Sequence, residues 1–193
     1  MSVPEIPTKL KGLDMSFGGS EKPMEHPKGR VRLVEDLQRK PDLPMAMHEA
    51  GQAFAYEFCN IRVERCVLES RVIDGEPAQC VGITEPVIKF EIAKHSLWLE
   101  VLCIMAGAAA QHGVDELGAV DSAVRDMHRA TEITKHVGLN LEQTDELIVE
   151  ASKAAAKVMI ENIATVRKIA DVLEQKKRIE GYEIRRIMAA RPR

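Results

Sequence analysis

The sequence predicts a mainly α-helical domain with a small β-hairpin after its first core helix. Aromatic residues make up only 4% of the 193 residues, whereas alanine, leucine and methionine, which enter helices at little cost, are plentiful. Several long stretches repeat apolar residues at steps of three and four, as helices with one buried face do. Two short stretches instead alternate and are rich in β-branched residues, which is typical of strands.

The N-terminal residues 1–30 combine prolines, glycines and charges without an apolar pattern. Such a segment buries too little apolar surface to offset its chain entropy, so we expect a disordered arm. The remaining residues, 31–193, are numerous enough to form one domain with a buried core. A short helix is predicted at its start, over Val31–Arg39.

The first core helix is predicted over Leu43–Phe58, with the sequence LPMAMHEAGQAFAYEF. Asp42 suits the capping position, and Pro44 falls in the first turn, where a missing N–H costs nothing. Small side chains make this helix thin, so a second helix should approach it closely. These small residues are Ala46, Ala50, Gly51 and Ala53.

Two strands are predicted next, in IRVERCVLES (61–70) and AQCVGITEP (78–86). The DGEP segment between them is rich in turn-forming residues, so the two strands should form a hairpin. Pro86 should end the second strand, because proline cannot donate a ladder hydrogen bond.

The rest of the chain predicts helices. One is expected over Glu91–His112, and another over Val120–Val137, with Gly113 and Gly118 breaking the chain between them. A longer helix should follow, because its apolar residues recur at steps of three and four from Ile148 to Leu173.

The two ends of this longest helix can be predicted from single residues. Thr144 is a suitable N-terminal cap, followed by acidic residues that favour the positive helix end. Gly181 should stop the helix, and YEIRRIM (182–188) should form a last short helix.

Composition excludes several classes of protein. A net charge of −3 gives no electrostatic reason to expect nucleic acid or a membrane surface as a partner. No stretch reaches the roughly 20 apolar residues that span a bilayer, and no GxxxxGK[ST] motif indicates an ATP site. Four cysteines without CxxC spacing predict core residues in a reducing cytoplasm. The basic stretch 153–193 predicts a solvated helix face or contact with an acidic partner.

The segment HEAGQ (48–52) within the first core helix resembles the HExxH motif of zinc peptidases. In that motif, two histidines one helical turn apart bind Zn²⁺, and the glutamate takes a proton from the zinc-bound water. His48 and Glu49 are present, but Gln52 stands at the second histidine. An isolated histidine is also often a structural residue, so the pair alone does not establish a site.

The order of motifs resembles the peptidase domain of FtsH-type AAA+ zinc proteases. That domain carries HEAGH, a small β segment, a helix ending in a motif like GGRAAE, a motif like SNDxxxATxxA, a long helix and a short closing one. In this chain the matching segments are HEAGQA, the two strands, AGAAAQ, RDMHRATEIT and IADVLEQKKRIEGYEIRRIM. The resemblance covers about residues 40–190 and implies an FtsH peptidase-domain-like helical bundle.

The resemblance also implies roles for individual residues. His48 matches the first zinc histidine and Glu49 the general base, while Gln52 departs from the pattern at the second histidine. Asp126 matches the third, carboxylate ligand, because it lies four residues before Ala130-Thr131. Asp121 is a rival for this role if the chain is aligned on Gly118-Ala119 instead.

The glutamine weakens the expected metal site, because an amide oxygen is a far poorer zinc donor than an imidazole nitrogen. Zinc should therefore bind weakly or not at all. His112 could replace the missing ligand and form, with His48 and Asp126, a metal-binding set of two histidines and one carboxylate. His112 could equally end its helix, where a cation is favourable.

Two functions remain open from the sequence. One is a stand-alone FtsH-like metallopeptidase that cleaves unfolded proteins or peptides, alone or with an AAA+ partner in trans. The other is a non-catalytic pseudo-peptidase that acts as an oligomerising or partner-binding module. Loss of a metal ligand favours the second, whereas retention of His48, Glu49 and Asp126 favours the first. The family forms hexameric rings, so the resemblance implies a homo-oligomer, which the small-residue helices and the basic C-terminal helix could support.

Overall fold

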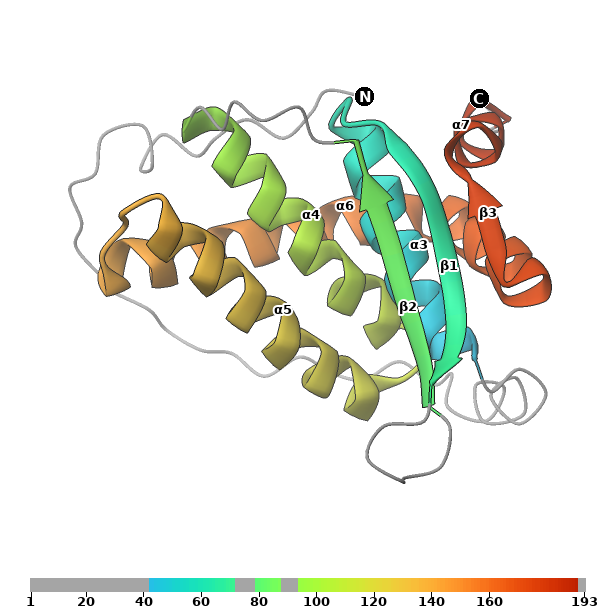
Figure 1. The fold of residues 1–193 in the computed structure, drawn as a ribbon, viewed down its shortest axis with the longest axis horizontal. Coiled ribbons are helices and arrows are strands. Elements are labelled where there is room, and N and C mark those ends of the chain that lie inside the picture. Colours follow the sequence, from blue (N-terminus) through green and yellow to red (C-terminus); the bar gives the residue numbers. More distant parts are fainter. Residues whose placement is uncertain (1–41, 72–78, 88–93, 191–193) are drawn as a thin grey trace.

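The protein, seen in a computed structural model, is described over residues 42–71, 79–87 and 94–190. These residues form a mostly helical bundle with a small three-stranded antiparallel sheet, as predicted in outline (Figure 1). The expected arm at 1–30 and the expected helix at 31–39 lie outside the described residues. Whether the bundle is specifically FtsH-like stays a prediction.

Helix α3 (Leu43–Phe58) is the centre of the bundle and has the predicted bounds. It packs against α4 (Lys94–His112), against α6 (Leu141–Lys176) and against the sheet (Figure 1). The close approach expected from its small residues is confirmed: a Cβ added at Gly51 would lie 2.5 Å from the Cβ of Ala110 on α4. The largest fully buried side chains include Phe54, Tyr56, Trp98 and Leu102.

Asp42 occupies the N-cap position of α3, as predicted, but its side chain forms no capping hydrogen bond. Its carboxylate instead accepts a hydrogen bond of 2.7 Å from the Lys177 ammonium, which lies just after the end of α6. The contact ties the start of the first core helix to a residue 135 positions later in the chain.

The predicted hairpin strands are present as β1 (Val63–Arg71) and β2 (Gln79–Pro86), which pair antiparallel. A third strand, β3 (Arg178–Glu180), pairs antiparallel with the other side of β1. The strand order β2-β1-β3 therefore leaves β2 at an edge of the sheet. Sequence reasoning missed β3, because three residues are too few to show an alternating pattern.

Helix α5 (Glu116–His136) begins earlier than predicted. The Asp115 side chain accepts a 3.0 Å hydrogen bond from the backbone N–H of Gly118 and so caps the helix. Gly118 therefore lies in the first turn of α5 and does not break the chain, which corrects the prediction. The cap satisfies an N–H that would otherwise have no partner within the helix.

Helix α6 also begins before its predicted cap. Asn140 and Gln143 bond reciprocally to each other's backbone N–H at the helix start. Thr144 is buried one residue further on, and its hydroxyl donates to the Thr134 hydroxyl of α5 at 3.0 Å. Thr144 therefore joins two helices, which corrects its assignment as a cap.

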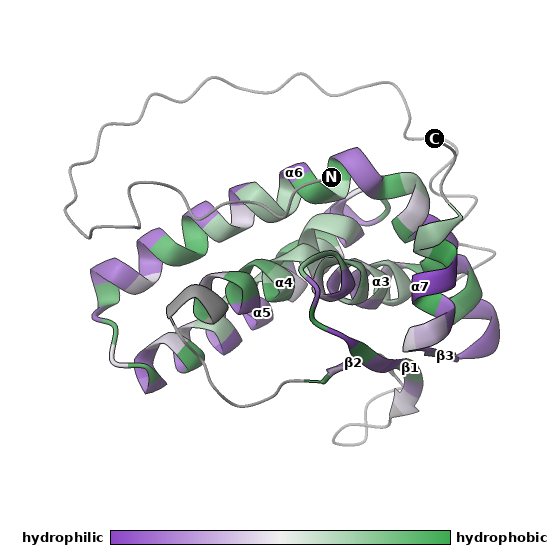
Figure 2. Cartoon of the chain, turned by 90° about the horizontal axis from the view of Figure 1, so that it is seen from above, coloured by the Kyte–Doolittle hydropathy of each residue, from purple (hydrophilic) through white to green (hydrophobic). Residues whose placement is uncertain are grey.

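The C-terminal part of the bundle follows the end of α6 at Lys176. Lys177 has a φ of 61°, which turns the chain out of the helix into β3. The last helix, α7 (Gly181–Ala189), then packs beside the sheet (Figure 1). Figure 2 shows apolar residues concentrated on α3 and α4, the helices inside the bundle. Among the described residues, no helix combines the length and apolarity needed to cross a bilayer.

Candidate functional site

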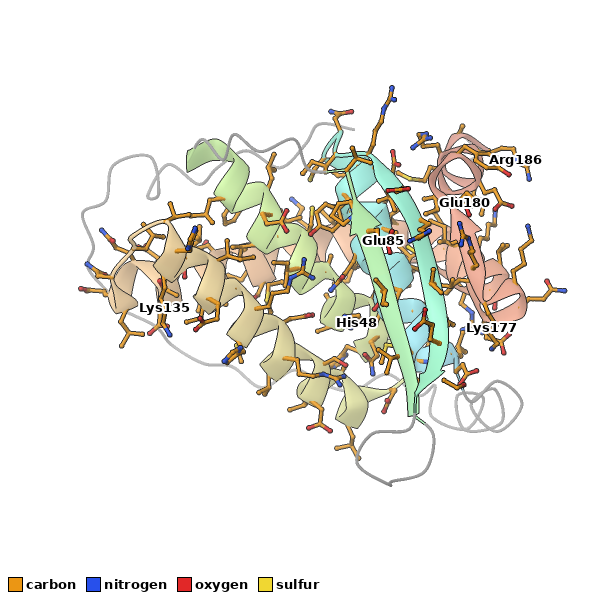
Figure 3. All side chains as sticks on the ribbon, viewed as in Figure 1. His48, Glu85, Lys135, Lys177, Glu180 and Arg186 are labelled. Carbon is orange, nitrogen blue, oxygen red and sulfur yellow. The ribbon has the colours of Figure 1, made fainter. Side chains whose placement is uncertain are left out.

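A pocket of about 390 Å³ opens between α3, α5 and the edge strand β2. Four residues singled out from the sequence line it: His48, Glu49 and Gln52 from α3, and Asp126 from α5. His48 lies in the space between β2 and the helices α4 and α5 (Figure 3). The packing of α5 against α4 and of β2 against α3 brings these side chains together. His48 and Asp126 line one pocket although they are 78 positions apart in the sequence.

The four side chains form the floor of the pocket and are buried. Their exposed fractions are 7% for His48, 4% for Glu49, 4% for Gln52 and 6% for Asp126. His48 and Gln52 are four residues apart on α3, so both project from the same helix face. Buried polar groups need partners, and the contacts among these four define what the site can do.

The carboxamide nitrogen of Gln52 lies among three acceptors. It is 3.1 Å from His48 Nε2, 3.4 Å from Asp126 Oδ1 and 3.3 Å from the carbonyl oxygen of Ile104. The reverse orientation would place the amide oxygen against lone pairs of the carboxylate and the carbonyl, so the nitrogen belongs there. His48 Nε2 then acts as an acceptor, which requires a neutral imidazole protonated on Nδ1.

The same geometry tests whether these residues suit zinc. His48 Nε2 and Asp126 Oδ2 are 3.6 Å apart, a separation that one ion bound to both could span. However, both groups point at the Gln52 nitrogen, which has no lone pair to offer a metal. Among the described residues, no three His, Cys, Asp or Glu side chains are placed to hold a metal ion. The donor set present does not fit a zinc site.

Burial controls the protonation of the His48 ring. It lowers the pKa of His48 to about 4, with a further contribution from the positive charge of Arg125. The nearby Gln111 side chain acts in the opposite direction and raises the pKa of His48. The Gln111 Oε1 and His48 Nδ1 atoms are nevertheless not within hydrogen-bond geometry of any group among the described residues. At neutral pH the imidazole is therefore uncharged, in agreement with its role as an acceptor for Gln52.

The two carboxyl groups are shifted in the opposite direction. Burial raises the pKa of Glu49 to about 7, against a hydrogen bond from Thr84 that favours the charged form. Burial also raises the pKa of Asp126 to about 7, and the negative charge of Glu49 adds to this shift. Both carboxyls therefore titrate near neutral pH, a property that is common at functional sites.

Three further residues shape the site and were missed from the sequence. The Thr84 hydroxyl on β2 donates to Glu49 Oε2 at 2.6 Å and orients the carboxyl group. Gly82, also on β2, leaves room for Glu49, since an added Cβ would overlap its side chain. Gly107 on α4 does the same for His48. Of the three, only Gly82 could have been noticed in the sequence. A glycine inside a predicted strand often marks a place where another group approaches the backbone closely.

His112 and Asp121, the other two candidates, are exposed and do not line the pocket. His112 is the last residue of α4, and the structure does not bring it to His48 and Asp126. Asp121 lies five residues before Asp126 on α5, and five residues turn a helix through about 500°, so the two side chains are about 140° apart. Asp126, the preferred candidate, is the one that faces the pocket.

Gly107→Ala is expected to destabilise the protein by about 1–3 kcal/mol through overpacking. The new Cβ would lie 2.6 Å from the His48 ring, which is buried and contacts Gln52 on its other side. The free energy of unfolding can be measured by urea titration. Gly113→Ala is the matched control, since its nearest neighbour would be 3.8 Å away. Equal stability of both variants would show that His48 is not packed against α4.

Comparisons with known proteins do not name a family. A scan against protein-family models and a search of curated proteins both found no match for this chain. The assignment of function therefore rests on the site itself.

Proposed function

We propose that this protein is a pseudo-peptidase, an FtsH-like domain that binds peptide segments without hydrolysing them. One observation carries the proposal: the Gln52 carboxamide nitrogen lies between His48 and Asp126, the position that a metal ion would need. A neutral N–H donor there contacts one atom of each group, His48 Nε2 and Asp126 Oδ1, while Asp126 Oδ2 is buried without a hydrogen-bond partner among the described residues. The amide nitrogen therefore takes the place that a metal ion would need between the histidine and the carboxylate.

This arrangement argues against hydrolysis by Glu49. In a zinc peptidase the glutamate takes its proton from a water whose pKa has been lowered by the metal. An amide group cannot lower the pKa of water in this way, so Glu49 has no activated nucleophile to deprotonate. The raised pKa of Glu49 alone does not replace the Lewis acid.

The edge strand supports peptide binding. Within the described residues, β2 pairs with β1 on one side only, and its residues from Cys80 to Thr84 line the pocket. An edge strand presents unpaired backbone N–H and C=O groups, which an extended peptide can satisfy by adding a strand. The pocket beside it would hold peptide side chains. An unfolded segment of a partner protein is therefore the expected ligand.

The proposal is tested with fluorescein-labelled casein, an unfolded protein. We expect its fluorescence anisotropy to rise on addition of the protein, with no fragments released over hours. Amide hydrogen exchange should slow in β2 on binding, while β3, the opposite edge of the sheet, serves as the control. Casein cleavage that Glu49→Gln abolishes would instead establish the active metallopeptidase.

Self-association stays a prediction with one supporting observation. Four apolar side chains of α5 are exposed at steps of three and four, a spacing typical of helix–helix seams. They are Leu117, Val120, Val124 and Met127. An AAA+ partner in trans and a cytoplasmic location also stay predictions.

A further inference from the structure

Two arginines stand on the α5 wall of the pocket, above its buried floor. Arg125 and Arg129 both line the pocket, and both are exposed. They are four residues apart on one helix, so they project from the same face and neighbour each other. The rim of the pocket therefore carries two adjacent positive charges.

The contacts of these arginines leave most of their donors available. Arg125 Nη2 donates to the Ser122 hydroxyl on the same helix at 3.2 Å. Arg129 Nη2 is 3.8 Å from Glu100 Oε1, too far for a hydrogen bond. Glu100 Oε1 instead accepts a 2.8 Å bond from the Tyr56 hydroxyl. Since each guanidinium has five N–H donors, the pair can bind another acceptor group.

The carboxyl groups of the floor do not use these donors. Glu49 Oε2 accepts from the Thr84 hydroxyl at 2.6 Å, and Asp126 Oδ1 accepts from Gln52 at 3.4 Å. Within the described part of the chain, neither carboxyl group forms an ion pair with Arg125 or Arg129. Burial raises the pKa of both carboxyl groups, and the positive charges of Arg125 and Arg129 oppose this shift, but the guanidinium N–H donors are not used by the floor.

We propose that Arg125 and Arg129 form a carboxylate subsite, which makes the protein selective for acidic peptides. The inference rests on the proposed peptide-binding function, because the β2 edge is the wall that would hold a peptide backbone. Carboxylates are the only anionic groups of an unmodified peptide at neutral pH. Arginine binds them through paired N–H···O bonds, which give specificity as well as affinity.

The test uses one ten-residue host peptide of threonine, valine and serine, labelled with fluorescein at its N-terminus. The first version has a central glutamate and an amidated C-terminus. The second has glutamine in place of the glutamate. The third has glutamine and a free C-terminal carboxylate. Anisotropy titrations against the full chain then distinguish a side-chain carboxylate from a terminal one as the bound group.

We expect at least one carboxylate peptide to bind about tenfold more tightly than the neutral peptide, as a charge-assisted hydrogen bond would give. Arg125→Gln should remove this preference, and Arg125→Lys should keep part of it. Arg186→Gln is the matched control, since Arg186 is an exposed arginine on α7, far from His48 (Figure 3). Circular dichroism would confirm that each variant is folded.

Equal binding of all three peptides by the parent protein would overturn the carboxylate subsite and leave peptide binding intact. A preference that survives Arg125→Gln and Arg129→Gln together would also overturn it. Absence of binding by every peptide and by casein would reject the proposed function and this inference with it.

Discussion

Gln52→His is expected to create a zinc site in this protein. The new imidazole would project from α3 beside His48, one turn apart on the same face. Asp126 already lies 3.6 Å from His48 through its Oδ2 atom and can supply the third ligand. Two imidazoles and a carboxylate, with an open fourth position, are a donor set that suits zinc. We expect about one zinc per chain in the variant and none in the parent.

Mass spectrometry of metals in untagged protein, purified without chelator, would measure this gain. Excess zinc should also stabilise the variant, by about 2.7 kcal/mol at a concentration one hundred times the dissociation constant. The double variant His48→Ala, Gln52→His is the control, because it keeps one imidazole and should lose the metal. A variant that binds no zinc would show that His48 and Asp126 do not converge as the structure places them.

Glu49→Gln is expected to stabilise the protein at alkaline pH. Burial raises the pKa of Glu49 from an ordinary value of 4.5 to about 7, so the folded state is penalised when this carboxyl ionises. Below pH 4.5 the group is protonated in both states and has no effect. Between pH 4.5 and 7 the parent loses stability as pH rises, and above pH 7 the loss is complete. Glutamine is neutral throughout and can still accept the Thr84 hydrogen bond.

The expected gain grows from near zero at pH 4 to about 3 kcal/mol at pH 8, since the shift of Glu49 is from 4.5 to about 7 and one pKa unit corresponds to about 1.4 kcal/mol. Comparing parent and variant at each pH cancels the opposing titration of His48, whereas removing the charge of Glu49 also lowers the raised pKa of Asp126 and adds to the gain. Urea unfolding at pH 4, 6 and 8 would measure it. Glu64→Gln, at an exposed glutamate of β1, should change stability by less than about 0.5 kcal/mol. A Glu49→Gln variant less stable than the parent at pH 8 would contradict the burial of this carboxyl.

These two variants separate the roles of the pocket residues. A gain of stability on replacing a buried polar residue indicates a group retained for binding or chemistry at a cost to folding. Zinc binding by Gln52→His would further show that one side chain separates this pocket from a zinc site. Together the results would place the protein among domains that keep the shape of a peptidase site and have lost its metal.

The elements of the fold could largely be predicted from local patterns. The bounds of α3 and the pairing of β1 with β2 follow from apolar periodicity and turn residues, which act within a few positions of the chain. The common face of His48 and Gln52 follows from the helical repeat alone. The weak metal site expected from the glutamine stays a prediction.

Only the tertiary structure decided the features that depend on packing between distant segments. Strand β3 forms because residues 178–180, just after α6, lie beside the free edge of β1 and pair with it. Asp126 lies on the buried face of α5 with Ser122 and Ala130, but His48 becomes its neighbour only because of the way α5 packs across α4. The shifted pKa values of His48 and Glu49 arise from burial, which is a property of the assembled pocket. The chain thus specified its helices and their faces locally, while the partners of each face were set by packing, because contacts between elements depend on their positions in three dimensions.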